Sequence, residues 1–168
     1  MDSKIIRIKI DDLKGPEVIG LLEEHHQDML LHSPLESIHA LDVTSLQADN
    51  VTFWSAWIDD KLAGCGALKH LTATHAEIKS MRTSYDFRRK GVAAEILQFI
   101  LDYAKKQNYS QISLETGSMD AFIPARKMYE KYGFIYCSPF ADYKEDVHSV
   151  FMSKNICSEQ GKTNDKIN

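Results

Sequence analysis

The sequence Arg88-Arg89-Lys90-Gly91-Val92-Ala93 limits the possible folds most strongly, because it joins a basic segment through a glycine to an amphipathic helix. Apolar residues recur every three or four positions over residues 92–104, which predicts a helix that begins just after Gly91. The first N–H groups of a helix lack intrahelical partners and carry a partial positive charge. Three cations and a glycine at this point therefore predict a site for a phosphate-bearing cofactor.

The segments on either side of this helix predict two strands that run parallel. Residues 77–83 form a β-prone run before the basic segment, and residues 111–115 form a short apolar run after the helix. A strand, a crossover helix and a second strand imply parallel pairing. Ile78 and Met81 are three positions apart, which breaks the alternation of a regular strand and predicts a β-bulge.

The rest of the chain predicts a mixed α/β fold of the α+β type. Two β-rich runs separated by residues 59–61 indicate a hairpin, and residues 32–40 read as a loop or broken helix. The expected strands are 4–10, 51–58, 62–71, 134–137 and 148–153, and the expected helices are 16–31, one turn at 41–46, and 121–132. These elements predict one domain over residues 1–156, with a mixed sheet, and a polar, disordered tail over residues 157–168.

The ends of the helix at 121–132 carry recognisable signals. Pro124 fits a first helical turn, and either Ser118 or Asp120 is able to cap the helix. Gly133 followed by Phe134 predicts a Schellman-type end.

Composition excludes several classes of protein. A net charge of −4 over 168 residues argues against a general nucleic-acid binder. No apolar run approaches the roughly 20 residues of a membrane helix, and residues 1–10 do not resemble a secretory signal, so we expect no membrane partner and a cytoplasmic location. The scattered cysteines are expected to be reduced thiols, and no histidine spacing indicates a metal site.

Two motifs resemble the GNAT superfamily of acyl-CoA-dependent N-acyltransferases. Arg88-x-x-Gly91-x-Ala93 is similar to its acyl-CoA pyrophosphate loop, and residues 125–134 resemble its second signature, a helix with a tyrosine that ends in Gly-Phe. The resemblance covers residues 4–154. Residues 37–42, 115–122 and 146–152 resemble more narrowly a bacterial branch, the YsnE-like proteins.

The resemblance implies a fold and a cosubstrate. It implies a central, twisted, mostly antiparallel sheet of six to seven strands with about four helices, split between the strand at 77–83 and the strand at 111–115. It implies acetyl-CoA as cosubstrate, with no metal, and direct transfer of an acetyl group to a primary amine of a small-molecule or amino-acid-like acceptor. The cofactor-binding residues that it implies are Met81, Arg82 and Thr83 along the pantetheine arm, and Arg88, Arg89, Lys90, Gly91, Val92 and Ala93 around the phosphates.

Two positions depart from the family pattern. Phe122 stands where the family often has an asparagine that helps to hold the pantetheine arm, so that contact is in doubt. Arg89 replaces the glycine that usually follows the first motif arginine, and it adds charge near the phosphates.

The resemblance also suggests catalytic residues. Tyr129 matches the family tyrosine and is the candidate general acid toward the coenzyme sulfur, since a phenol stays protonated at neutral pH. Glu77 is the candidate base, and Glu115, at a strand end beside the same cleft, is its rival. Without the resemblance, Tyr129 would be interpreted as a core aromatic and Glu77 as a surface or salt-bridged strand carboxylate. His39, in a loop, is a candidate for orienting the acceptor.

Two classes of function remain open. One is an N-acetyltransferase, and the other is a non-catalytic acyl-CoA-binding regulatory domain that keeps the phosphate loop. The resemblance favours a homodimer, and the sequence leaves the oligomeric state and the acceptor open.

Overall fold

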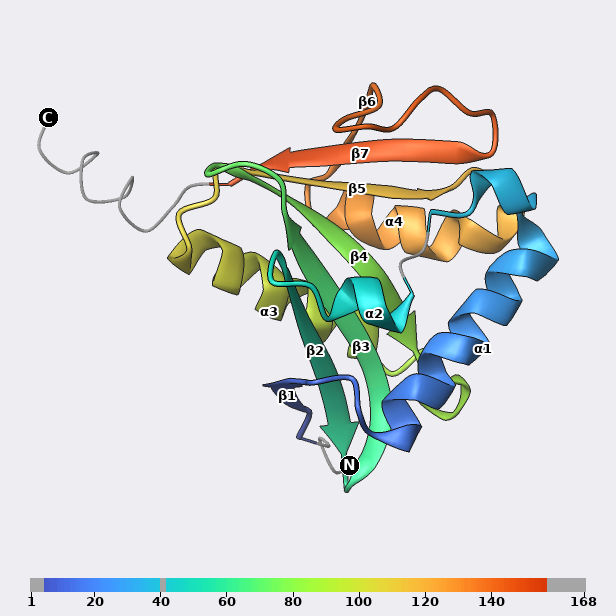
Figure 1. The fold of residues 1–168 in the computed structure, drawn as a ribbon, viewed down its shortest axis with the longest axis vertical. Coiled ribbons are helices and arrows are strands. Elements are labelled where there is room, and N and C mark those ends of the chain that lie inside the picture. Colours follow the sequence, from blue (N-terminus) through green and yellow to red (C-terminus); the bar gives the residue numbers. More distant parts are fainter. Residues whose placement is uncertain (1–4, 40–41, 157–168) are drawn as a thin grey trace, which may run out of the picture.

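Seven strands form one mixed sheet in the computed structural model, which describes residues 5–39 and 42–156. The strand order is β1-β2-β3-β4-β5-β7-β6, so the first strand lies at one edge of the sheet (Figure 1). The strands are β1 (Arg7–Ile10), β2 (Val51–Ile58), β3 (Lys61–His70), β4 (His75–Thr83), β5 (Gln111–Gly117), β6 (Ile135–Cys137) and β7 (Ser149–Asn155). Only β4 and β5 pair in parallel, as the crossover predicts.

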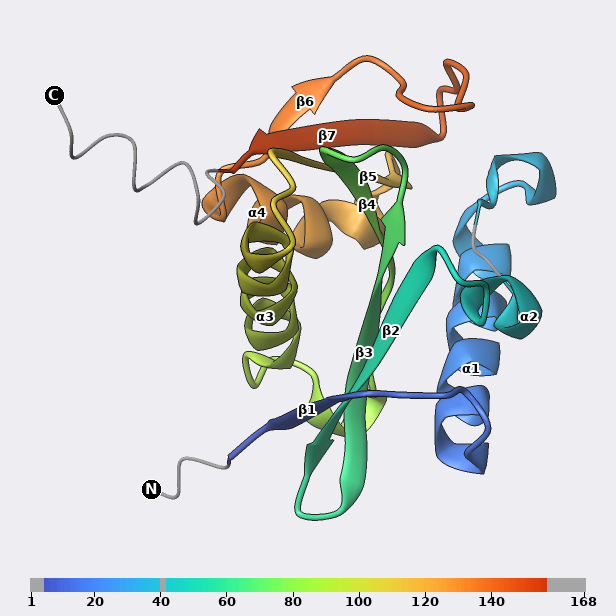
Figure 2. The ribbon, with the colours of Figure 1, turned by 60° about the vertical axis from the view of Figure 1, so that its left-hand side comes forward.

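Four helices cover the two faces of this sheet (Figure 2). Helices α1 (Pro16–His32) and α2 (Val43–Leu46) lie on one face, and α3 (Val92–Lys106) and α4 (Ile123–Lys131) lie on the other. Successive side chains of a strand point to opposite faces, so Phe53 packs with the α1 core and Trp54 with the α3 core. Three short 3-10 turns, η1 (Leu35–Ser37), η2 (Tyr85–Phe87) and η3 (Asp120–Phe122), lie in the connections.

The two glycines of β3 let α3 approach the sheet closely. A Cβ at Gly64 would lie 2.7 Å from the carbonyl oxygen of Arg82, and one at Gly66 would lie 2.9 Å from Ile96 of α3. Side chains at these positions would push α3 and β4 away from β3. Cys65, between the glycines, is fully buried, which agrees with its prediction as a small core residue.

The predicted β-bulge is present in β4. Cys65 pairs with Arg82 and Ala67 pairs with Lys79, so β4 has more residues than β3 between these two pairs. Ser80, inside the irregular segment, adopts a left-handed backbone conformation with φ of 56°. A bulge bends its strand, so the second half of β4 takes a different direction from the first.

The sheet opens beyond this point between β4 and β5. Their parallel pairing runs from His75 and Gln111 to Ile78 and Leu114, where it ends, although both strands continue. The split that the resemblance implies is thus present. It leaves a cleft between the second half of β4 and the end of β5.

The two predicted ends of α4 have different outcomes. Phe134 N–H donates to the carbonyl of Tyr129, Gly133 N–H donates to that of Glu130, and Gly133 has φ of 92°, which together make the predicted Schellman end. The predicted side-chain cap is wrong, because η3 precedes α4 and no side chain caps either helix. Ser118 instead donates its hydroxyl to the carbonyl of Val147.

The remaining expectations concern the tail, the cysteines and membrane-spanning helices. The predicted tail at 157–168, including Cys157, lies outside the described residues. Cys65 and Cys137 are free thiols. Over residues 5–39 and 42–156, no helix is long and apolar enough to cross a membrane.

Candidate active site

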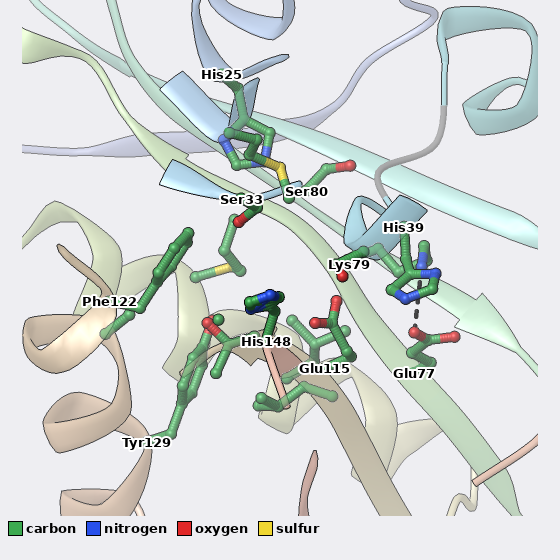
Figure 3. Close-up of a pocket in the computed structure, with 18 residues that line it drawn as sticks. His25, Ser33, His39, Glu77, Lys79, Ser80, Glu115, Phe122, Tyr129 and His148 are labelled. Atoms are coloured by element: carbon green, nitrogen blue, oxygen red, sulfur yellow. Dashed lines mark hydrogen bonds and ion pairs between the residues drawn. The ribbon is translucent and has the colours of Figure 1, made fainter. Parts of the chain in front are cut away.

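A cavity of about 130 Å³ lies where β4 and β5 separate (Figure 3). Side chains from both faces of the sheet line it, because the missing strand pairing connects the α1 side with the α4 side. The lining residues are His25, Met29, Ser33, Ser37, His39, Glu77, Ile78, Lys79, Ser80, Met81, Leu114, Glu115, Thr116, Gly117, Phe122, Ala125, Tyr129 and His148. The cavity thus includes Tyr129, Glu77 and Glu115, all three candidate catalytic residues of the sequence.

Tyr129 reaches the cavity from α4. Its side chain is 5% exposed, packs against Phe134, and points from the helix toward His148 (Figure 3). Burial raises the pKa of the Tyr129 phenol above its ordinary value, so the hydroxyl keeps its proton at neutral pH. Tyr129 is therefore a core aromatic that also lines a cavity, and its role as general acid stays a prediction.

Glu77 lies in a buried polar network rather than as an isolated carboxylate. Lys79 Nζ donates to Glu77 Oε2 at 3.1 Å, and the Tyr143 hydroxyl donates to the same oxygen. Lys79 also donates to the Tyr143 hydroxyl at 2.9 Å. Burial, and then the charge of Glu77, raises the pKa of Tyr143, so this phenol remains a donor. Glu77 thus forms the predicted salt bridge, but it does not lie on the surface, because it is only 2% exposed. Its Oε2 atom already has two donors.

We expect the Glu77→Gln substitution to lower the free energy of unfolding by about 3 kcal/mol, because it leaves the Lys79 cation buried without a counter-charge. Urea unfolding monitored by circular dichroism measures this change. The double variant Glu77→Gln, Lys79→Met should recover at least half of the loss, because it also removes the unpaired cation. A single variant as stable as the wild type would show that the ion pair does not stabilise the fold.

Glu115 lines the same cavity from β5 and lies in a different electrostatic environment. Burial raises the pKa of Glu115 to about 7, and the nearby Ser149 hydroxyl and Lys79 ammonium oppose this rise. A carboxylate with a pKa near neutrality is suited to accept a proton and release it again at physiological pH. Both candidate bases of the sequence analysis therefore line the cavity, and Glu115 is the one without an ion-pair partner within the described residues.

The predicted phosphate loop leads into α3 as expected. Gly91 is the N-cap of α3 and has φ of 80°, and Val92 behind it is buried. Arg89 also has a left-handed backbone, with φ of 64°, at the position where the family usually has glycine. The side chains of Arg89 and Lys90 are exposed, and the first N–H groups of α3 lie beside them.

The other two arginines of the predicted site face α1. Arg82 forms an ion pair with Asp28 at 2.6 Å, and Arg88 approaches the same carboxylate at 3.5 Å while it stacks on Tyr85 at 3.9 Å. The guanidinium of Arg82 is thus not available to the cleft between β4 and β5. Any contribution of Arg82 to cosubstrate binding must come from its backbone, as the sequence analysis expects.

Comparisons with known proteins give the family. The model of the acetyltransferase (GNAT) family matches residues 17–134. The chain belongs to the GNAT family. It is 58% identical over 151 residues to the uncharacterized N-acetyltransferase YsnE of Bacillus subtilis, covering 90% of this chain and 100% of that protein. It is 49% identical over 150 residues to the uncharacterized N-acetyltransferase YedL of Escherichia coli, and the match covers 89% of this chain and 94% of that protein.

Solved structures of GNAT proteins share the fold. A GNAT acetyltransferase from Elizabethkingia anophelis, solved with acetyl-CoA bound, superposes with a TM-score of 0.66 at 17% identity, covering 90% of this chain and 98% of that one. The resemblance inferred from the two motifs is thereby confirmed for the family, for its bacterial branch and for the fold.

Phe122, which stands where the family often has asparagine, lines the cavity. The ring of Phe122 lines the cavity and packs directly on Gly117, where a Cβ would lie 2.3 Å from the ring. Phe122 thus offers an apolar surface where the family asparagine offers an amide. The glycine on β5 makes room for it.

Three residues at or next to the cavity had no role assigned from the sequence. His25 and His148 come from α1 and from the loop before β7, and Tyr143, which closes the Glu77 network, comes from the same loop. The quoted segment 146–152 contains His148, but its likeness to the bacterial branch gave no role for it. No group of three or more His, Cys, Asp or Glu side chains suited to a metal ion occurs in the described part of the chain.

Proposed function

We propose that this GNAT protein transfers an acetyl group from acetyl-CoA directly to a primary amine of a small-molecule or amino-acid-like acceptor. The observation that carries the proposal is the opening between β4 and β5, at which a buried phenol, Tyr129, and a carboxylate of raised pKa, Glu115, line one cavity. A cytoplasmic location and a homodimer stay predictions of the sequence analysis.

The cosubstrate fits the residues present. The exposed Arg89 and Lys90 and the first N–H groups of α3 would hold the pyrophosphate, and Gly91 lets it approach the backbone. The pantetheine arm would lie along the unpaired side of β4 and hydrogen-bond to the backbone of residues 81–83 as an added strand does. Its thioester end would then reach the cavity beside Tyr129.

The chemistry needs two proton transfers. Glu115 would take a proton from the acceptor ammonium, directly or through water, so that the neutral nitrogen forms a bond to the thioester carbonyl carbon. The carbon–sulfur bond then breaks, and Tyr129 would donate its proton to the leaving sulfur. The acylated nitrogen then returns a proton to the Tyr129 phenolate, and Glu115 releases its proton to water, which completes the balance. We thus propose Glu115 in the role first predicted for Glu77, which would hold the cavity wall through Lys79 and Tyr143.

Two measurements on the same preparation test this function. Calorimetry with acetyl-CoA detects cosubstrate binding, and release of free CoA thiol in the presence of a panel of primary amines detects transfer. We expect binding, and thiol release above the amine-free control with at least one amine. Binding without release from any amine would support the non-catalytic acyl-CoA-binding domain, and the absence of binding would refute both.

A further inference from the structure

The charges around the cavity show which acceptors it would tolerate. Among its described lining residues, Lys79 is the only lysine or arginine, and its Nζ is committed to Glu77 and Tyr143. The lining also carries two carboxylates, Glu77, which pairs with Lys79, and Glu115. A carboxylate on the acceptor would therefore enter a partly buried space without a free guanidinium or ammonium to pair with it, which is costly.

The adjoining cavity strengthens this argument. It shares His39 and Glu77 with the first cavity, so the charges of its wall lie beside the first cavity. Its described lining contains more carboxylates than ammonium groups: Glu36, Glu77, Asp142, Glu145 and Asp146 against Lys69 and Lys144. This surface attracts a cationic amine and repels an anionic molecule.

A second observation comes from His25 at the α1 end of the cavity, across from Tyr129 (Figure 3). Its Nδ1 atom is buried and has no hydrogen-bond partner. Burial, and then the charge of Arg82, lowers the pKa of His25 to about 4, so the ring is neutral at physiological pH. No hydrogen bond holds the His25 ring within the described residues, so the part of the ring that lines the cavity is open to a hydrogen-bonding group of a ligand.

The residues around His25 limit the chemical type of the ligand group that pairs with it. Met29 and Met81 line the cavity near it, and the hydroxyls of Ser33 and Ser80 also line the cavity. A neutral imidazole beside the Arg82 cation does not suit a second cation, whereas it suits a hydroxyl or an amide. The acceptor thus needs an amine at the Glu115 end and a neutral hydrogen-bonding group at the His25 end.

We propose, on the basis of the proposed function, that the acceptor is a small primary amine without a carboxylate, whose hydroxyl or amide group hydrogen-bonds to the imidazole of His25. The cavity volume of about 130 Å³ restricts the part of the acceptor inside it to a short chain. His25 is then a specificity-determining residue of the reaction, and Glu115 keeps its proposed role toward the amine.

Matched amines of nearly equal size test this proposal. We would measure kcat/KM at pH 8 for 3-amino-1-propanol against butylamine, and for β-alaninamide against β-alanine. The wild type should prefer the hydroxylated amine over the alkyl amine, and the amide over the carboxylate, each by about tenfold or more, because a site with an unpaired polar group discriminates against an acceptor that cannot pair with it.

Variants of His25 assign the preference. His25→Phe keeps a planar ring without nitrogen atoms and should reduce the preference for 3-amino-1-propanol over butylamine about tenfold. His25→Gln keeps a donor and an acceptor and should retain part of it. His26→Phe, which changes the exposed neighbour on the same helix, is the matched control and should keep the wild-type preference. Acetyl-CoA binding by calorimetry verifies that each variant is folded.

Distinct results would overturn the inference and the proposed function. Equal use of the hydroxylated and alkyl amines, or better use of β-alanine than of its amide, would refute the inference while the transfer activity stands. A loss of the same size for every amine in His25→Phe would also refute it, because a structural role has that effect. No thiol release with any amine would refute the proposed function and the inference together.

Discussion

Substitution of Tyr129 by phenylalanine should lower kcat by about 10² to 10³-fold, while the affinity for acetyl-CoA changes little. The phenol is buried in α4, lines the cavity, and keeps its proton because burial raises its pKa. Phenylalanine preserves the packing against Phe134 and removes only the donor toward the leaving sulfur. Thiol-release kinetics measure kcat, and calorimetry measures binding.

Tyr132 offers a matched control for this experiment. It follows α4, and its hydroxyl donates to the carbonyl of Ala94 at 3.4 Å, away from the cavity lining. Tyr132→Phe therefore removes the same atom from a neighbouring tyrosine that has no role in the reaction. Equal turnover by wild type and Tyr129→Phe with a good acceptor would remove Tyr129 from the acid role. A large loss in binding instead would indicate that Tyr129 supports the cosubstrate site.

The second large effect concerns Glu115 and pH. A general base acts only when it is deprotonated, so kcat/KM should rise with pH through about 7, the value to which burial raises the pKa of Glu115. Glu115→Gln should abolish this rise and lower kcat/KM at pH 8 by about 10²-fold or more. A pH–rate profile of both proteins, with one acceptor and saturating acetyl-CoA, measures the change. If the rise disappears in Glu77→Gln and persists in Glu115→Gln, the base is Glu77.

Glu115→Gln should raise the stability of the folded chain at pH 8, although it lowers activity. The pKa of Glu115 is higher in the folded chain than its ordinary value of 4.5, so between pH 4.5 and about 7 the folded state binds more protons than the unfolded state. The contribution of Glu115 to stability is therefore fully present below pH 4.5 and is lost as pH rises through 7. At pH 8, Glu115→Gln should be more stable than the wild type by about 2 kcal/mol, measured by urea unfolding.

Local sequence patterns predicted most of the helices and strands. The period of apolar residues over 92–104 predicted α3, and the broken alternation between Ile78 and Met81 predicted the bulge in β4. Both features depend on neighbours within a few positions, so the sequence contains them directly. The cap of α4 was not predictable in this way, because η3 intervenes and Ser118 bonds to Val147, a residue far along the chain.

The site was less predictable because its partners are distant in sequence. Glu77 lies two positions from Lys79, but Tyr143, which completes the network, lies 66 positions away in a loop without regular structure. The environment of Glu115 depends on which groups the folded chain buries around it, and no pattern in residues 111–115 encodes that burial. The sequence pattern around His25 assigned it no role, because nothing nearby in the chain shows which groups the fold brings next to its ring.

The pairing of β4 with β5 ends at Ile78 and Leu114, so the stability of the folded chain would depend on whether acetyl-CoA is bound there. Under the proposed function, the pantetheine arm supplies hydrogen bonds that the sheet lacks at this opening. A ligand that binds only the folded chain raises its stability by about 2.7 kcal/mol at about 100 times its dissociation constant. The lifetime of this protein against proteolysis would then follow the supply of acetyl-CoA, so that molecules without cosubstrate are degraded first.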